Sequence, residues 1–163
     1  MRPDLLLFGL MMAVPPLTAD QRPVEMSAAG GLSVDLKRHI GIAKKDVVIR
    51  RDDVTVCCDE AEAVYSGNQI EKVTCRGRVV IVRPDGTQAT ADLAVFLASQ
   101  DQVTLSGNAQ VVTPEAKLTG EKIIYDIGKD QLEVAGKKSK FQYGPPKKGA
   151  ANPPVRPCPP EAS

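Results

Sequence analysis

The 163-residue chain has no tryptophan, a single histidine and only six aromatic residues, three Phe and three Tyr. One histidine, His39, and the absence of a Cys-x-x-Cys pair leave few ligands for a metal site. No phosphate-binding loop, G-x-S-x-G nucleophile turn or G-x-G-x-x-G dinucleotide fingerprint is present. The sequence therefore predicts a protein that is not an enzyme, with no metal and no cofactor.

The chain also lacks an excess of charge. It has 21 Lys and Arg against 20 Asp and Glu, for a net charge of +1. Such a balance gives no general attraction to a polyanion. Basic residues do not alternate with aromatics, as a stacking surface for single strands would need. Nucleic acid is therefore not an expected partner.

Helical periodicity is absent from the central part of the chain, and so is proline except at two expected turns. Residues 37–136 contain only Pro84 and Pro114, which suits a continuous sheet. Short alternating or β-branched runs follow one another between turn residues, nine to twelve in all. This pattern favours an all-β sandwich, jelly roll or solenoid.

A unit of about 30 residues recurs three times within this β region. Each unit contains an acid, then an aromatic, then a turn and a β-branched strand that ends at a glycine. The closing glycines are Gly77, Gly107 and Gly136, and the aromatics are Tyr65, Phe96 and Tyr125. The acids are Asp59, Asp92 and Glu121. We expect these acids to satisfy backbone amides at turns or strand edges rather than to form a carboxylate site.

The two ends of the chain differ from its centre. Residues 1–19 have the layout of a secretory signal, with an apolar run from Leu5 to Val14 and cleavage expected after Ala19. The alternatives are a short uncleaved anchor or a misplaced start site. Residues 20–36 are predicted to be an amino-terminal arm, 37–143 the β domain, and 144–163 a disordered tail rich in proline and lysine.

The four cysteines become interpretable if the protein is exported. Cys57 and Cys58 are neighbours on an expected strand, so they point to opposite faces and only one can face Cys75. We expect one disulfide, from Cys75 to either Cys57 or Cys58; the alternative is unpaired apolar cysteines. Cys158 lies in the tail and has no evident partner.

The recurring aromatics allow two interpretations. They can be ordinary core residues, or they can line an apolar groove for a long ligand. Several nearby alanines, which leave volume unfilled, favour a groove modestly. They are Ala61, Ala63, Ala94 and Ala98.

Gly120-Glu-Lys-Ile-Ile-Tyr-Asp126 is similar to the Gly-Asp-Lys-Ile-x-Tyr-Asp motif, and Leu105-Ser-Gly-Asn108 to the Leu-x-Gly-Asn turn, of the LptA/OstA-like periplasmic protein family. Asp59-Glu-Ala-Glu-Ala-Val-Tyr65 resembles its Asp-x-Ala-x-x-x-Tyr strand. The likeness covers roughly residues 43 to 136. It departs from the family in the adjacent cysteines, in Glu121 and in the basic tail.

The resemblance implies a two-sheet β-jelly roll, open at both ends, that carries lipopolysaccharide through the periplasm between the inner and outer membranes. It implies lipid A acyl chains inside the roll, end-to-end homo-oligomers, and jelly-roll domains of the membrane components as partners. By position, the residues that would face the lipid are Val47, Ile49, Ala63, Tyr65, Ala94, Phe96, Leu105, Ile123, Tyr125, Ile127 and Leu132.

Two other functions stay open. One is an LptC-like component of the same pathway, anchored in the inner membrane, against which the short, proline-ended apolar run argues. The other is a structural or cell-surface β-solenoid that assembles without lipid.

Overall fold

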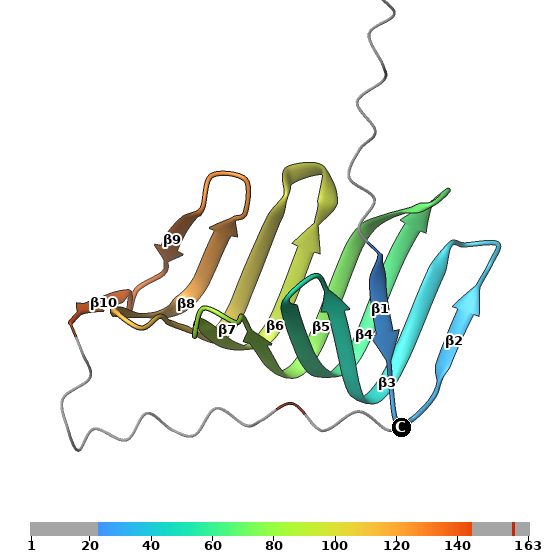
Figure 1. Cartoon of the computed structure of the whole chain (residues 1–163), viewed down its shortest axis with the longest axis horizontal. Helices are drawn as coiled ribbons and strands as arrows, with labels where there is room; N and C mark the ends of the chain where they lie inside the picture. The colour runs from blue at the N-terminus through green and yellow to red at the C-terminus, as the bar shows by residue number, and fades with distance from the viewer. Residues whose placement is uncertain (1–22, 145–157, 159–163) are drawn as a thin grey trace, which may run out of the picture.

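The computed structural model describes residues 23–144 and Cys158 (Figure 1). The predictions of a signal segment and of a disordered tail fall outside these residues, except at Gly144 and Cys158. The elements are β1 (Val24–Ser27), β2 (Leu32–Asp35), β3 (Ile40–Arg51), β4 (Val54–Ser66), β5 (Gln69–Val82), β6 (Gln88–Leu97), the 3-10 helix η1 (Ala98–Gln100), β7 (Gln102–Val112), β8 (Ala116–Asp126), β9 (Gln131–Ala135) and β10 (Lys140–Tyr143).

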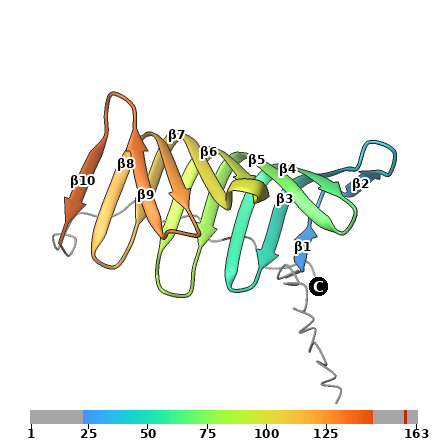
Figure 2. The same cartoon turned by 90° about the horizontal axis from the view of Figure 1, so that it is seen from above.

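All ten strands belong to one antiparallel sheet. Strands β3 to β8 pair in sequence order as successive hairpins (Figures 1 and 2). At one end of the sheet β1 and β2 pair with two different parts of β3, and at the other end β10 and β9 do the same with β8. The sheet does not close, so the predicted all-β, jelly-roll-like fold open at both ends is confirmed.

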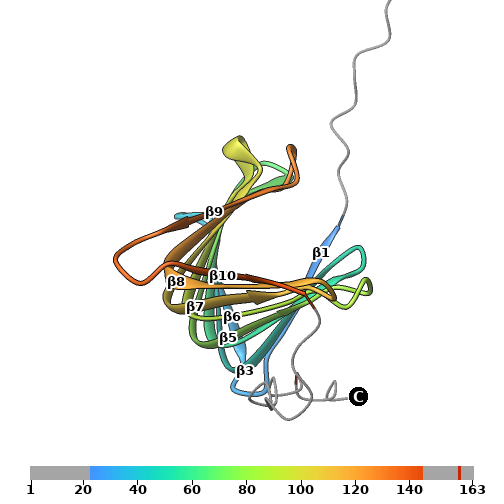
Figure 3. The same ribbon diagram turned by 90° about the vertical axis from the view of Figure 1, so that its left-hand side faces the viewer.

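The sheet is bent along a line that crosses its long strands. The register shifts once near the middle of each pairing from β3–β4 to β7–β8, and such bulges bend a strand. Figure 3 shows the result as two arms. The first arm holds β1, β10 and the turns β3–β4, β5–β6 and β7–β8; the second holds β2, β9 and the turns β4–β5, β6–β7 and β8–β9. The two expected sheets are thus two arms of one sheet.

The recurring acids and glycines lie at this bend. Gly107 has φ +75°, and a Cβ on it would lie 2.6 Å from Oδ2 of Asp92. Gly77 meets Asp59, and Gly136 meets Glu121, in the same way. Only glycine tolerates both the positive φ and the close carboxylate. The expectation that these acids lie at turns or strand edges was wrong, because all three lie within long strands.

The residue after the glycine fixes the acid in two of the three units. Arg78 (φ +46°) donates hydrogen bonds to Asp59 and forms an ion pair with it. Asn108 (φ +48°) donates from Nδ2 to Asp92 over 3.0 Å. These contacts hold neighbouring strands together at the point where both change direction.

The segment expected to be a polar arm contains β1 and β2. Met26 pairs with Ile49 in β3, and both Val24 and Met26 pack against the core. Its polar residues, such as Glu25 and Ser27, alternate with these apolar ones, so the segment forms a strand with one buried side. No helix within the described ranges has the length and hydropathy needed to cross a membrane.

Candidate functional site

The face enclosed between the two arms, here called the concave face, carries most of the core. On the second arm, Cys75, Ala94, Leu105, Ile123 and Val134 pair across β5 to β9 in one continuous row. The first four are almost fully buried and Val134 is partly buried. The side chains of this row are small on β5 and β6, where they are Cys75 and Ala94, and larger on β7 to β9.

A second row runs beside the first, nearer the free ends of the second arm. Val73, Phe96, Val103, Tyr125 and Leu132 pair across β5 to β9. The first four of these are half-buried, whereas Leu132 is 37% exposed. The side chains of the concave face are thus buried near the bend and more exposed toward the mouth, which is the opening between the free ends of the arms.

The eleven residues that the sequence assigns to the lipid path differ in exposure in the same way, from buried near the bend to accessible toward the mouth. Tyr65, Phe96 and Tyr125 are half-buried, and Ile127 and Leu132 are 37% exposed. Fully or almost fully buried members are Val47, Ile49, Ala63, Ala94, Leu105 and Ile123.

Sequence reasoning missed the first arm's share of the concave face. On the first arm, a row of paired apolar side chains crosses β3 to β8. It consists of Ile49, Val56, Ile81, Ala89, Val111 and Leu118. Only Ile49 had been named. The family motifs lie on the second arm, and the run Arg78–Val82 hides its alternation because Val79 and Val80 are buried on opposite faces.

Two arginines of the first arm reach aromatics of the second. Nη1 of Arg83 donates to the hydroxyl of Tyr125 over 3.1 Å, and this hydroxyl donates to Oδ1 of Asp130 over 2.7 Å. Burial, followed by the hydrogen bond to Asp130, raises the pKa of Tyr125, so the phenol stays neutral. Cζ of Arg51 lies 5.6 Å from the ring centre of Phe96. The two arms therefore touch across the mouth at two of the three recurring aromatics.

The third recurring aromatic has a different neighbour. The rings of Tyr65 and His39 meet edge to face, with centres 5.4 Å apart. His39 lies just before β3 and accepts a hydrogen bond from the Tyr65 amide through its carbonyl oxygen. Unlike the arginine contacts, this one stays within the second arm.

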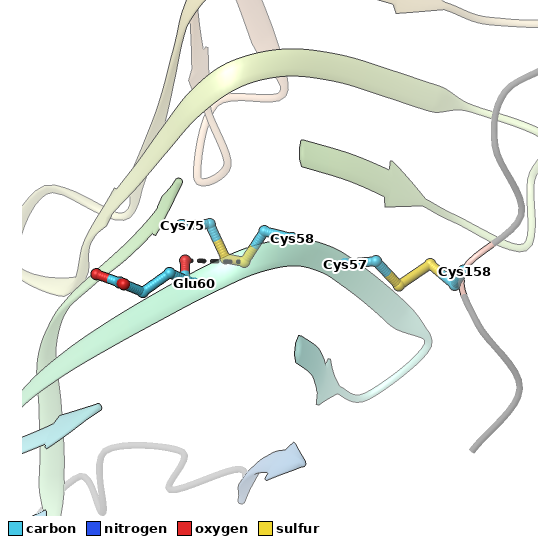
Figure 4. Close-up of a disulfide and its surroundings, with 5 residues drawn as sticks. All are labelled: Cys57, Cys58, Glu60, Cys75 and Cys158. Carbon is cyan, nitrogen blue, oxygen red and sulfur yellow. Dashed lines mark hydrogen bonds between the residues drawn. A yellow bond between two sulfur atoms is a disulfide. The ribbon is translucent and has the colours of Figure 1, made fainter. Parts of the chain in front are cut away.

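The adjacent cysteines form two different disulfides. Cys58 pairs with Cys75 (Cα–Cα 5.8 Å), one of the two expected pairings, and both residues belong to the core cluster. Cys57 pairs with Cys158 (Cα–Cα 5.7 Å), although Cys158 had been assigned no partner. Figure 4 shows the two bridges leaving β4 from successive residues. Cys57 and Cys58 face opposite sides of the sheet. Cys58 meets Cys75 on one side, and Cys57 pairs with Cys158 on the other.

The convex face, which is the outer side of the bent sheet, is apolar where Cys158 attaches. Val48, Cys57 and Val80 pair side by side across β3, β4 and β5, and each is only 5–6% exposed. Elsewhere along that row the partners are polar, such as Thr90 and Gln110.

Metal-ligating side chains do not gather anywhere in the described part of the chain. No three His, Cys, Asp or Glu residues within it lie close enough together to hold an ion. The candidate site is the apolar concave face with its mouth contacts.

The comparisons with known proteins agree with this geometry. The family model of the LptA/(LptD N-terminal domain) LPS transport proteins matches residues 28–131. Among solved structures, LptH of Pseudomonas aeruginosa matches with a TM-score of 0.69 and 18% identity, over 77% of this chain and 97% of that one. LptH is described as the LptA-homologous periplasmic component of a lipopolysaccharide transport device, and at this identity the likeness shows the fold alone. A search of curated proteins finds no match. On the strength of the family model, the chain belongs to the LptA/(LptD N-terminal domain) family of LPS transport proteins.

Proposed function

We propose that the protein binds the acyl chains of lipopolysaccharide along its concave face and carries the lipid through the periplasm between the inner and outer membranes. The observation that carries this proposal is the pair of unbroken apolar rows, which run from β5 to β9 and become accessible toward the mouth. The eleven residues named from the resemblance would form part of the lipid path.

Such a path would act without covalent chemistry. Exposing acyl chains to water costs roughly 25 cal/mol for each Å² of apolar surface. A continuous apolar face removes most of this cost at every point along the sheet. Half-buried residues such as Val73 and Val103 would give up little of their own packing when a chain lies against them.

The two ends of the sheet support assembly into a longer path. Large apolar side chains are exposed at both ends: Leu32, Val34 and Leu36 at and just after β2, and Ile127, Leu132, Phe141 and Tyr143 at or near β9 and β10. Edge strands with exposed apolar residues recruit further strands. We propose that copies of this chain, and jelly-roll domains of membrane components, join there and continue the rows.

Export through a cleaved signal would place the protein in the periplasm. The two disulfides are consistent with an oxidising compartment. An anchored, LptC-like role remains the alternative, and the residues that would decide it precede residue 23. A structural protein without lipid is the second alternative.

The test compares neighbouring residues on opposite faces of β7. Val103 and Thr104 are both half-buried, with Val103 on the concave face and Thr104 on the convex face. We expect Val103→Glu to reduce bound lipopolysaccharide about tenfold or more, because a carboxylate against acyl chains loses its hydration. Thr104→Glu should bind as the wild type does. Bound lipid is quantified by mass spectrometry after gel filtration, with thermal unfolding as the check on folding.

Equal lipid binding by folded Val103→Glu and wild-type protein would contradict the proposal. So would an equal loss in both variants, because it would follow the added charge rather than the face.

A further inference from the structure

The contacts across the mouth suggest a role for the two arginines that make them. Arg51 ends β3 and Arg83 follows β5, so both lie at strand ends on the first arm. Each reaches a strand three positions along the sheet, β6 for Arg51 and β8 for Arg83. The equal offset indicates that the twist of the sheet, rather than chance, brings each arginine over the concave face.

Both guanidinium groups keep donors available. An arginine has five N–H donors. Among the described residues, no carboxylate forms an ion pair or hydrogen bond with Arg51, whose observed contact is the face of Phe96. Arg83 uses one donor on Tyr125, and its Nη2 lies 3.6 Å from Oδ2 of Asp85, with its side chain 37% exposed. A cation over a ring is still free to donate at its edge.

We infer that Arg51 and Arg83 form a phosphate-binding pair at the mouth, which holds the anionic headgroup of an amphiphile whose chains lie on the concave face. This inference rests on the proposed function. The arginines come from strands two positions apart, about 10 Å at the usual strand spacing. They can therefore contact two anionic groups of one headgroup, and arginine suits phosphate through paired donors.

The neighbouring acids predict an order of effects. Asp85 and the Tyr125–Asp130 pair partly neutralise Arg83, whereas the acids next to Arg51, Asp52 and Asp53, are exposed at the turn. Arg51 should therefore contribute more to headgroup binding. Removing the charge of Asp130 should strengthen binding, because the carboxylate competes with phosphate for Arg83.

The test uses two amphiphiles with the same chain, oleoyl lysophosphatidate and monooleoylglycerol. For each, the dissociation constant of the full-length protein is measured by displacement of a fluorescent fatty acid. The quantity compared is the preference, which is the ratio of the constant for monooleoylglycerol to that for lysophosphatidate. Inorganic phosphate is titrated separately.

We expect the wild type to prefer the phosphate headgroup about tenfold, and Arg51→Gln and Arg83→Gln each to lower that preference about three- to fivefold. Asp130→Asn should raise it while keeping an acceptor for Tyr125. The matched controls are Arg50→Gln and Arg76→Gln, which remove the same charge from the convex face of β3 and β5. Both should keep the wild-type preference.

A preference unchanged in both arginine variants, or lowered equally by the convex-face controls, would overturn the inference. Inorganic phosphate that binds as tightly as lysophosphatidate would also overturn it, because the site would then take free phosphate. Equal binding of both amphiphiles by the wild type would overturn the headgroup site alone. Binding of neither would overturn the proposed function as well.

Discussion

The concave and convex faces share the same strands but differ in what they carry at the bend. The concave side has small apolar residues there, such as Ala61, Ala91 and Ala109, all at most 6% exposed. The convex side has a carboxylate against a glycine in each repeat. At the bend, the convex side is therefore lined by polar groups and the concave side by small apolar side chains.

The largest expected effect tests the convex side of the bend. Gly107→Ala should lower the free energy of unfolding by about 3 to 4 kcal/mol, because its Cβ would meet Asp92 in a backbone conformation that L residues avoid. Chemical denaturation measures the change.

The control for this change is Gly67→Ala. Gly67 also has positive φ (+56°) but open space around it, so we expect a loss of only about 1 kcal/mol. Adding Asp92→Ala to Gly107→Ala should recover part of the loss. Equal losses at the two glycines would show that the close carboxylate of Asp92 adds nothing to the cost of a Cβ at Gly107.

The next effect concerns the concave disulfide. Replacing Cys58 and Cys75 together by alanine should lower the free energy of unfolding by about 2 to 3 kcal/mol, because the bridge closes a segment with a sequence separation of 17. Alanine suits a site that already borders Ala61 and Ala94.

This double variant also tests the pairing of the convex disulfide. The Cys57–Cys158 bridge should stay intact, so a maleimide should label no thiol, even after unfolding without reductant. A labelled Cys57 or Cys158 in the variant would contradict separate bridges on the two faces.

The smallest effect concerns the mouth of the concave face. Tyr125→Phe should lower the free energy of unfolding by about 1 kcal/mol near neutral pH, because it removes the hydrogen bonds with Arg83 and Asp130. The pKa of Tyr125 is raised in the folded protein. Its contribution to stability is therefore complete below about pH 10, the ordinary tyrosine value, and falls as the pH rises beyond it.

The difference in unfolding free energy between wild type and Tyr125→Phe should shrink above pH 10, measured by denaturation at a series of pH values. A difference that grows in that range would contradict the hydrogen-bonded, neutral phenol at the mouth.

The repeat in the sequence predicted much of the fold, because every unit uses the same acid, aromatic and glycine. The repeat nevertheless predicts strand ends at Gly77 and Gly107, whereas the structure shows each strand continuing through its glycine. A glycine within a strand and one at its end look alike in a single sequence. The close acid does not distinguish them either, because Gly136, just after the end of β9, meets Glu121 as Gly77 and Gly107 meet their acids.

The cross-arm contacts could not be predicted for a different reason. Arg83 and Tyr125 are 42 residues apart, and their meeting depends on the bend and on the twist together. The Cys57–Cys158 bridge likewise joins residues 101 apart in the sequence. In contrast, the concave side of β8 was found correctly, because Ile123 and Tyr125 alternate with charged Lys122 and Asp126.

Lipid is proposed to lie on the concave face alone. Photo-crosslinking in an envelope preparation tests it most directly, with a photoreactive side chain at Phe96 or Tyr125 on the concave face and at Lys122 on the convex face. We expect lipopolysaccharide adducts at the two aromatic positions and none at Lys122. Folded protein that forms no adduct at either aromatic, or equal adducts at all three positions, would contradict the claim.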